Sequence, residues 1–516
     1  MKACATGQTL PQQSINGNLF LPVPDTDLGH LIAETEQLLC FAPVILPAIE
    51  ADLDAYAKEK KRLRLEDRRF FESQTPDLPS VNIPQVDIAA KDLHLQTGRP
   101  RMLARVIYMF LMLRGYLGSI SDQQAVCFLH ESMNIHAWLM NNGVQMPGVS
   151  TIIENINAVS QETRTLIFDR QIAYIVDAQL DDFKDLTIDS TAVKANSRWP
   201  TDSKILTGLL ARVHRVGQSL TVFGLKNFQK GWIPRWLEEM NSLDFQIATA
   251  GGKPNAKTKL YQHYRQLLRQ AGKALAALEK QFTDLEQYFN PNAFAPSQRL
   301  QVERVVKQLR DDLDDAGRVR QYTHERIFEN KTQPSTEKVL SLSDGSACFI
   351  QKGGREAVIG YKPQLVRSAN GFVSSLIVPD SNAADSAMLV VSILKAKNRS
   401  GVLPGSVSTD DGYASAKGLQ TLLDLGIKTV SISGAKGKKL TDPQDWDSPD
   451  YKQARRCRSA VESLMFTIKD GFEFDQLGRR GIRAVRDELL EKVLAYNTCR
   501  IILMRQRYRQ ALQQAA

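Results

Sequence analysis

The stretch LTIDSTAVKA, residues 186–195, is short, apolar and rich in β-branched side chains, and Trp199-Pro200 follows it. These features are typical of a strand that is buried on both faces. The stretch carries a single carboxylate, Asp189. An ionised carboxylate in a buried strand costs several kcal/mol unless it is paired or bound to a metal. Asp189 is therefore the first candidate for a functional residue.

A second block of strand and helix signals lies further along the chain. Its Asn370-Gly371 pair, between alternating apolar runs, predicts a β-hairpin. Two adjacent acids, Asp410 and Asp411, follow a predicted strand, and Glu462 lies within a predicted helix. The expected elements are strands over 338–344, 357–368 and 371–380, a helix over 384–397, a strand over 405–409, a helix over 413–424, a strand over 427–432 and a helix over 451–470.

The last of these helices carries a cationic face around Glu462. At 100° per residue, Arg455, Arg458 and Lys469 all lie within 40° of Glu462, if the helix is continuous. An ordinary surface helix with salt bridges is one interpretation. A phosphodiester site is the other, because such sites use carboxylates on strand ends and a flanking helix to hold two divalent cations.

Together, TIDST (187–191), GYKPQL (360–365), STDDGYAS (408–415) and the spacing R-x3-E-x6-K (458–469) resemble a bacterial insertion-sequence transposase of the DDE type. The resemblance implies a ribonuclease-H-like catalytic domain, an α/β fold with a mixed sheet flanked by helices. The family pattern Ala-Asp-x-Gly-Tyr aligns with residues 409–413, which favours Asp410 over Asp411. The family signature also has a Tyr where this chain has Arg455.

The resemblance further implies a catalytic and metal-binding triad of Asp189, Asp410 and Glu462 with two Mg²⁺ or Mn²⁺ ions. It implies DNA contacts from Arg458, Lys469, Arg455 and Lys362, with the element's terminal inverted repeats and target DNA as partners. The expected reaction is cleavage at element ends followed by strand transfer, carried out by a homodimer. Two alternatives stay open: a metal-dependent nuclease of the same fold, and a domesticated DNA-binding protein with a relic catalytic domain.

The catalytic domain is expected to be interrupted. Residues 225–335 are helical and highly charged, with two long periodic segments that break at Asn290-Pro291.

The region before the catalytic domain is expected to be all-α; its short helices permit a helix-turn-helix, and a plain bundle is the alternative. Within it, Ser121 precedes one helix, and Thr151 with Glu154 predicts a capping box for another near 152. The expected divisions are 1–100, helical with a Pro-rich linker; 101–182, a helical DNA-binding region; 183–224 and 336–476, catalytic; 225–335, the insertion; and 477–516, a basic helical tail.

Charge and cysteine content fit these expectations. The chain has 66 Lys and Arg against 57 Asp and Glu, a formal charge of +9. The first 100 residues are net acidic, so the surplus lies in the remainder, and a phosphate-bearing partner is favoured. The six cysteines form no CxxC pair, and no segment has the composition of a signal peptide or membrane span. We therefore expect a cytoplasmic, nucleoid-associated protein with no membrane partner.

Overall fold

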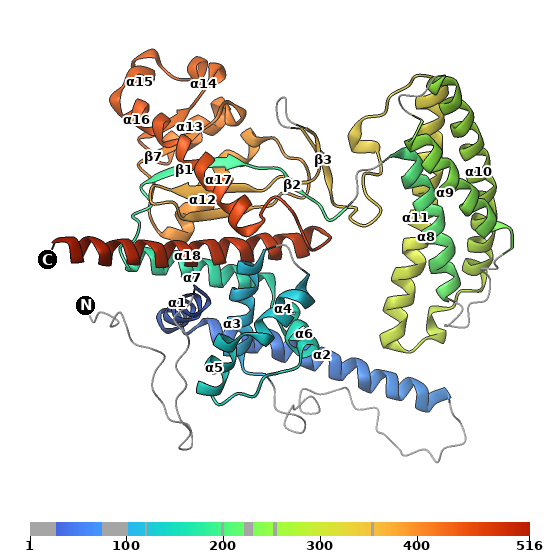
Figure 1. The fold of residues 1–516 in the computed structure, drawn as a ribbon, viewed down its shortest axis with the longest axis horizontal. Helices are drawn as coiled ribbons and strands as arrows, with labels where there is room; N and C mark the ends of the chain where they lie inside the picture. Colours follow the sequence, from blue (N-terminus) through green and yellow to red (C-terminus); the bar gives the residue numbers. More distant parts are fainter. Residues whose placement is uncertain are drawn as a thin grey trace. The chain divides into compact units, whose positions relative to one another are not determined.

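The computed structural model describes residues 27–74, 102–118, 121–197, 201–220, 231–250, 255–351 and 356–515 (Figure 1). They belong to two compact units. The first unit comprises residues 1–56, 99–196 and 346–516, and the second comprises 57–98 and 197–345. Within the described residues, no helix is both long and apolar enough to span a membrane.

A mixed five-stranded sheet forms the centre of the first unit. Its order is β6-β5-β1-β7-β8. The central strand β1 runs parallel to β7 and antiparallel to β5; β7 and β8 are parallel, and β5 and β6 are antiparallel. The bounds are β1 Asp185–Ser190, β5 Gln364–Ser368, β6 Val373–Ile377, β7 Ser406–Thr409 and β8 Thr429–Ile432.

The predicted hairpin is confirmed and joins β5 to β6. Gly371 has φ +91°, a left-handed conformation that a residue with a Cβ adopts at a cost, and its N–H donates to the Ser368 carbonyl at 3.0 Å. The expected strand over 357–368 is instead two strands in two sheets. Pro363 lies between them, where it cannot donate to a ladder. The second sheet has the order β2-β4-β3, with β2 Val193–Lys194, β4 Val358–Tyr361 and β3 Cys348–Ile350.

The strand expected over 338–344 is wrong. A 3₁₀ turn, η5 (Ser335–Glu337), precedes irregular backbone there. The Ser341 hydroxyl accepts hydrogen bonds from the N–H groups of Ser343 at 3.2 Å and Asp344 at 3.0 Å. Such local bonds occupy the backbone donors that a ladder would use.

Helices cover the five-stranded sheet. α12 packs on β1, β5 and β6, α16 packs on β7 and β8, and α17 contacts β1. The helix expected over 451–470 is two helices that meet at Arg458, without a Gly or Pro to mark the junction. The bounds are α12 Asp385–Ser400, η6 Asp411–Tyr413, α13 Ala416–Asp424, α14 Ala435–Leu440, α15 Pro443–Asp447, α16 Pro449–Cys457 and α17 Ser459–Phe472.

The described N-terminal part of the first unit is all-α, as expected. Ser121 forms a capping box with Gln124 at the start of α4. The box expected at Thr151 is wrong, because α6 begins earlier, after Gly148. The bounds are α1 Asp27–Phe41, α2 Ile45–Gln74, α3 Ala104–Arg114, η2 Gly115–Leu117, α4 Asp122–Glu131, α5 Met133–Asn141, α6 Val149–Ala158 and α7 Gln161–Asp177. The part of α2 after residue 56 belongs to the second unit.

The C-terminal helix α18, Ile482–Ala515, packs against α1, α3, α7 and β6 (Figure 1). Val485, Leu489, Val493 and Leu494 are buried. Its basic residues are in part engaged internally, since Lys492 donates to the carbonyls of Glu473 and Gln476 at 3.0 Å. The tail expected as a separate basic segment is therefore, over much of its length, part of the core of the first unit.

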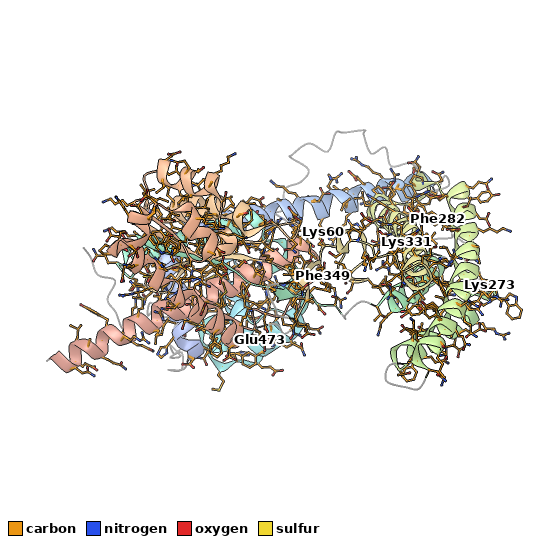
Figure 2. The ribbon with its side chains drawn as sticks, turned by 90° about the horizontal axis from the view of Figure 1, so that it is seen from above. Lys60, Lys273, Phe282, Lys331, Phe349 and Glu473 are labelled. Atoms are coloured by element: carbon orange, nitrogen blue, oxygen red, sulfur yellow. The ribbon has the colours of Figure 1, made fainter. Side chains whose placement is uncertain are left out.

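The second unit contains a helical bundle with one shared apolar core. The core takes Leu206, Leu209 and Val213 from α8 as well as residues of the following helices. On α10, Phe282 is buried in this core and Lys273 is exposed (Figure 2). α8, which the sequence assigned to the catalytic domain, thus packs with the insertion. The bounds are α8 Asp202–Ser219, α9 Ile233–Ala248, α10 Ala256–Tyr288, η4 Pro291–Ala293 and α11 Pro296–Phe328.

Candidate active site

Two of the three expected carboxylates lie on adjacent parallel strands. In the pairing of β1 with β7, Thr187 is opposite Ser408. Continuing this register by two residues places Asp189 level with Asp410, which directly follows β7. Neighbouring strands are about 4.8 Å apart. The sheet therefore brings these two carboxylates to one edge, although 221 positions separate them in the sequence.

Backbone N–H groups orient both carboxylates. The N–H of Ser190 donates to Asp189 Oδ1 at 2.6 Å, and the N–H of Gly412 donates to Asp410 Oδ1 at 2.9 Å. Both aspartates are half-buried. The strand ends therefore hold the two carboxylates in place, and both remain partly accessible to solvent, as a site that binds a polymer requires.

The neighbouring acid Asp411 has a structural role. Its Oδ1 accepts hydrogen bonds from the N–H groups of Lys436 at 2.8 Å and Gly437 at 2.9 Å, in the first turn of α14. Gly434 has φ +105°, and a Cβ there would lie 2.7 Å from Asp411 Cβ. Because its carboxylate satisfies the start of a helix, Asp411 is a poorer candidate than Asp410.

A buried polar network that the sequence did not predict lies beside the aspartates. Asp385, in the first turn of α12, accepts hydrogen bonds through Oδ1 from Lys362 Nζ at 2.9 Å and Gln364 Nε2 at 3.0 Å. The Tyr413 hydroxyl donates to Gln364 Oε1. A Cβ on Gly412 would lie 3.1 Å from Asp410 Oδ1 and 3.3 Å from Asp385 Oδ2, so these two carboxylates approach one point.

The pKa values of this network follow from its burial and charges. Burial raises the pKa of Tyr413 above its ordinary value, and the carboxylates of Asp385, Asp189 and Asp410 raise it further. Burial opposes ionisation of Asp385, but hydrogen bonds from Gln364, Lys362 and Ser190 outweigh it and hold the pKa of Asp385 below its ordinary value. Asp385 therefore stays ionised and neutralises Lys362.

Glu462 is not assembled with the aspartates. It lies in the first turn of α17 with its side chain 67% exposed, 3.6 Å from Arg458 Nη2. Lys469 follows in the last turn of α17, and Phe466, one turn after Glu462, is 72% exposed. An exposed aromatic ring beside these charges gives this part of α17 a surface that suits a partner with planar groups.

Arg455 and Lys362 have intramolecular partners. The Arg455 guanidinium lies 4.0 Å from the Trp446 ring centroid and donates to the Trp446 carbonyl at 2.8 Å. Arg455 thus stacks at the corner of α15 and α16 instead of sharing a continuous helix face with Glu462. Lys362 also donates to the Ala383 carbonyl at 3.1 Å. DNA contacts from Arg455 and Lys362 stay predictions, and each would compete with these interactions.

The donor set fits the expected divalent cations in part. Asp189 and Asp410 supply the carboxylate oxygens that Mg²⁺ and Mn²⁺ prefer. Among the residues with described positions, however, no three His, Cys, Asp or Glu side chains gather closely enough to hold a metal ion. Glu462 would therefore have to move toward the aspartates to complete a site.

Removing the Tyr413 hydroxyl tests the buried network. We expect Tyr413→Phe to lower the free energy of unfolding by about 1–3 kcal/mol, because Gln364 Oε1 loses its buried donor. Urea unfolding measures this loss. Tyr508→Phe is the matched control, since that ring is 68% exposed. Equal stability of the two variants would contradict a structural role for the Tyr413 hydroxyl.

Comparison with known proteins bears on this site. Residues 331–498 match the family model described as transposase DDE domain. The match includes Asp410 and Glu462, and Asp189 lies before it. It implies a ribonuclease-H-like fold, with which the mixed five-stranded sheet and its helices are consistent. No curated protein and no solved structure matches the chain.

Proposed function

We propose that this chain, a DDE transposase by its matched domain, cuts DNA at the ends of a mobile element and joins those ends to target DNA. The observation that carries the proposal is the register that sets Asp189 beside Asp410 at one edge of the sheet. The match itself lacks Asp189, so the sheet supplies independent support for including it. The capping role of Asp411 leaves Asp410 as the acid available at the second strand.

In this proposal, Asp189 and Asp410 would hold the divalent cations, with Glu462 as the third ligand. Bound Mg²⁺ or Mn²⁺ would supply an activated water and stabilise the charge on the leaving oxygen. Arg458 and Lys469 hold backbone phosphates beside Glu462. A phosphate that pairs with Arg458 would compete with Glu462 for that guanidinium. The family resemblance implies that two catalytic domains bring two element ends together, so we propose a homodimer.

A joining assay separates this function from its alternatives. The purified chain is incubated with Mg²⁺, labelled duplexes made from the DNA on either side of its gene, and a supercoiled plasmid. We expect labelled DNA joined to the plasmid. Cleavage without joining would favour a nuclease of the same fold. Binding without cleavage would favour a DNA-binding protein with a relic catalytic domain.

Glu462→Gln tests the third ligand. We expect end cleavage to fall on the order of a hundredfold or more, because an amide is a weaker metal ligand than a carboxylate. The midpoint of thermal unfolding should not change, since the side chain is exposed. Asp470→Asn, a change on the same helix outside the proposed triad, is the control. Full cleavage by Glu462→Gln would remove Glu462 from the proposed site.

A further inference from the structure

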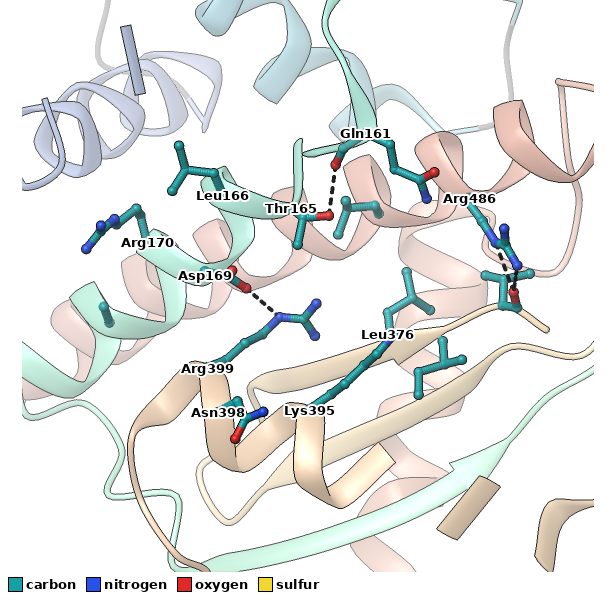
Figure 3. Close-up of a pocket in the computed structure, with 14 residues that line it drawn as sticks. Gln161, Thr165, Leu166, Asp169, Arg170, Leu376, Lys395, Asn398, Arg399 and Arg486 are labelled. Carbon is teal, nitrogen blue, oxygen red and sulfur yellow. Dashed lines mark hydrogen bonds and ion pairs between the residues drawn. The ribbon is translucent and has the colours of Figure 1, made fainter. Parts of the chain in front are cut away.

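A groove of about 770 Å³ lies in the first unit between α7, β6, α12 and α18 (Figure 3). Four cations line it: Arg170 from α7, Lys395 and Arg399 from α12, and Arg486 from α18. Asp169 is the single acid in its lining. The groove shares no residue with the network around Asp189 and Asp410.

The acid does not balance the cations. Asp169 pairs with Arg399 at 2.7 Å, and the same guanidinium stacks 4.3 Å from the Phe168 ring centroid. Arg486 donates to the Val378 carbonyl and contacts Asp380, whose side chain is 79% exposed, at 3.0 Å. In the described parts of the chain, neither Arg170 nor Lys395 has a hydrogen-bond or ion-pair partner.

Positive charge is crowded around Lys395. Partial burial lowers the pKa of Lys395, and the nearby charges of Arg399 and Arg486 lower it further. Repulsion of this kind is relieved when an anion binds among the cations. Because the cations come from three separate helices, the folded unit as a whole creates this positive groove.

We propose that the groove binds the phosphodiester backbone of DNA at a place separate from the catalytic aspartates, which extends the proposed function. Arg and Lys side chains suit phosphate oxygens, and their contacts position DNA without reading its sequence. Apolar side chains such as Leu166 and Leu376 lie among the charges and can pack against sugars. The groove is large enough for a sugar–phosphate segment, whereas a single small anion would fill little of it.

The test measures how DNA binding depends on salt. The double variant Arg170→Gln/Lys395→Gln is made in an Asp189→Asn background, and binding of a labelled 30-base-pair duplex is followed by fluorescence anisotropy at several salt concentrations. Loss of two phosphate contacts should lower the slope of log affinity against log salt by about 1.8, at roughly 0.9 per contact. Both side chains are exposed, so the fold should be unaffected.

The control is Lys397→Gln/Lys428→Gln, which removes the same formal charge. Lys397 is two residues from Lys395 on α12, about 200° around the helix, and neither control residue lines the groove. An equal change in slope for both pairs, or none for the groove pair, overturns the inference. The inference is also overturned if the groove variant loses affinity for polyglutamate but keeps its affinity for DNA, because the ligand would then be an acidic peptide. DNA binding by the groove can be measured independently of catalysis. If the groove variant lowers the slope but the wild type does not cleave DNA, only the proposed function is contradicted.

Discussion

Asp189→Asn is expected to abolish Mg²⁺-dependent cleavage of element-end DNA, with a loss on the order of a thousandfold or more. Asparagine preserves the size of the side chain and can still accept the hydrogen bond from the Ser190 N–H. It removes the negative charge that the proposed metal ions require beside Asp410. DNA affinity should change little, because the proposed phosphate contacts come from other residues.

Asp185→Asn provides the matched control for this change. Asp185 begins the same strand, at the end opposite the proposed site, where its carboxylate accepts a hydrogen bond from the Ser406 hydroxyl at 2.6 Å. We expect Asp185→Asn to cleave at close to the wild-type rate. If Asp189→Asn also cleaves at that rate, Asp189 has no role in catalysis, and the register of β1 with β7 does not mark the catalytic site.

The two aspartates could be selected from sequence because their signals are local. Asp189 is a carboxylate in a β-branched run, and Asp410 follows another such run just before Gly412. The structure confirms both strands and places the two acids together. Glu462 was selected from the charged face of its helix and from the family spacing R-x3-E-x6-K. Spacing indicates which face of a helix a residue occupies without showing how far that face lies from the sheet.

The network around Asp385 could not be predicted in the same way. Gln364 begins β5 and Lys362 lies two residues before it, whereas Asp385 comes from a helix and Tyr413 from a turn. Their meeting depends on the antiparallel register that sets Gln364 opposite Ser190. A sequence pattern without that register gives each residue an ordinary local role, such as a helix cap for Asp385.

The packing partners of α8 could not be predicted for a similar reason. α8 follows β1 and β2 in sequence, which favoured its place in the catalytic domain. Its apolar face, with Leu206, Leu209 and Leu210, packs with the helices that come after it. An amphipathic pattern shows that a helix has a buried face but does not identify what covers that face.

Glu491→Gln is expected to destabilise the fold more than Tyr413→Phe or any of the changes at the proposed site. Glu491 is buried on α18 and accepts hydrogen bonds from Arg114 at 2.6 Å, from Arg479 at 2.6 Å and from Arg164. The side chains of Arg114, Arg164 and Glu491 are 3%, 2% and 2% exposed. The variant leaves the arginines without their shared carboxylate, and uncompensated buried charge costs about 3–5 kcal/mol.

Urea unfolding at pH 7 measures this cost, with Asp182→Asn as the control. Asp182 pairs with Lys184 at 3.6 Å, but both side chains are more than 60% exposed, so the control should lose less than about 1 kcal/mol. A loss that small for Glu491→Gln would show that the three arginines find other partners or water when the carboxylate is removed.

The pH dependence of the free energy of unfolding provides a second measurement of the role of Glu491. Burial opposes the charge on Glu491, but Arg114, Arg479 and Arg164 outweigh it and hold the pKa of Glu491 well below its ordinary value. The stabilisation is therefore present above the pKa of the unfolded chain, about 4.3, and is lost as the pH falls through the lower pKa of the folded state.

Burial raises the pKa of the neighbouring Asp487, so that residue works in the opposite direction. Glu491 contributes to the raised pKa of Asp487, so removing Glu491 also shifts Asp487. The comparison is therefore made in an Asp487→Asn background, where the difference in stability caused by Glu491→Gln should stay constant from pH 7 to about 5 and shrink only in stronger acid. A difference that shrinks between pH 7 and 6 would contradict an ionised Glu491 as the centre of this cluster.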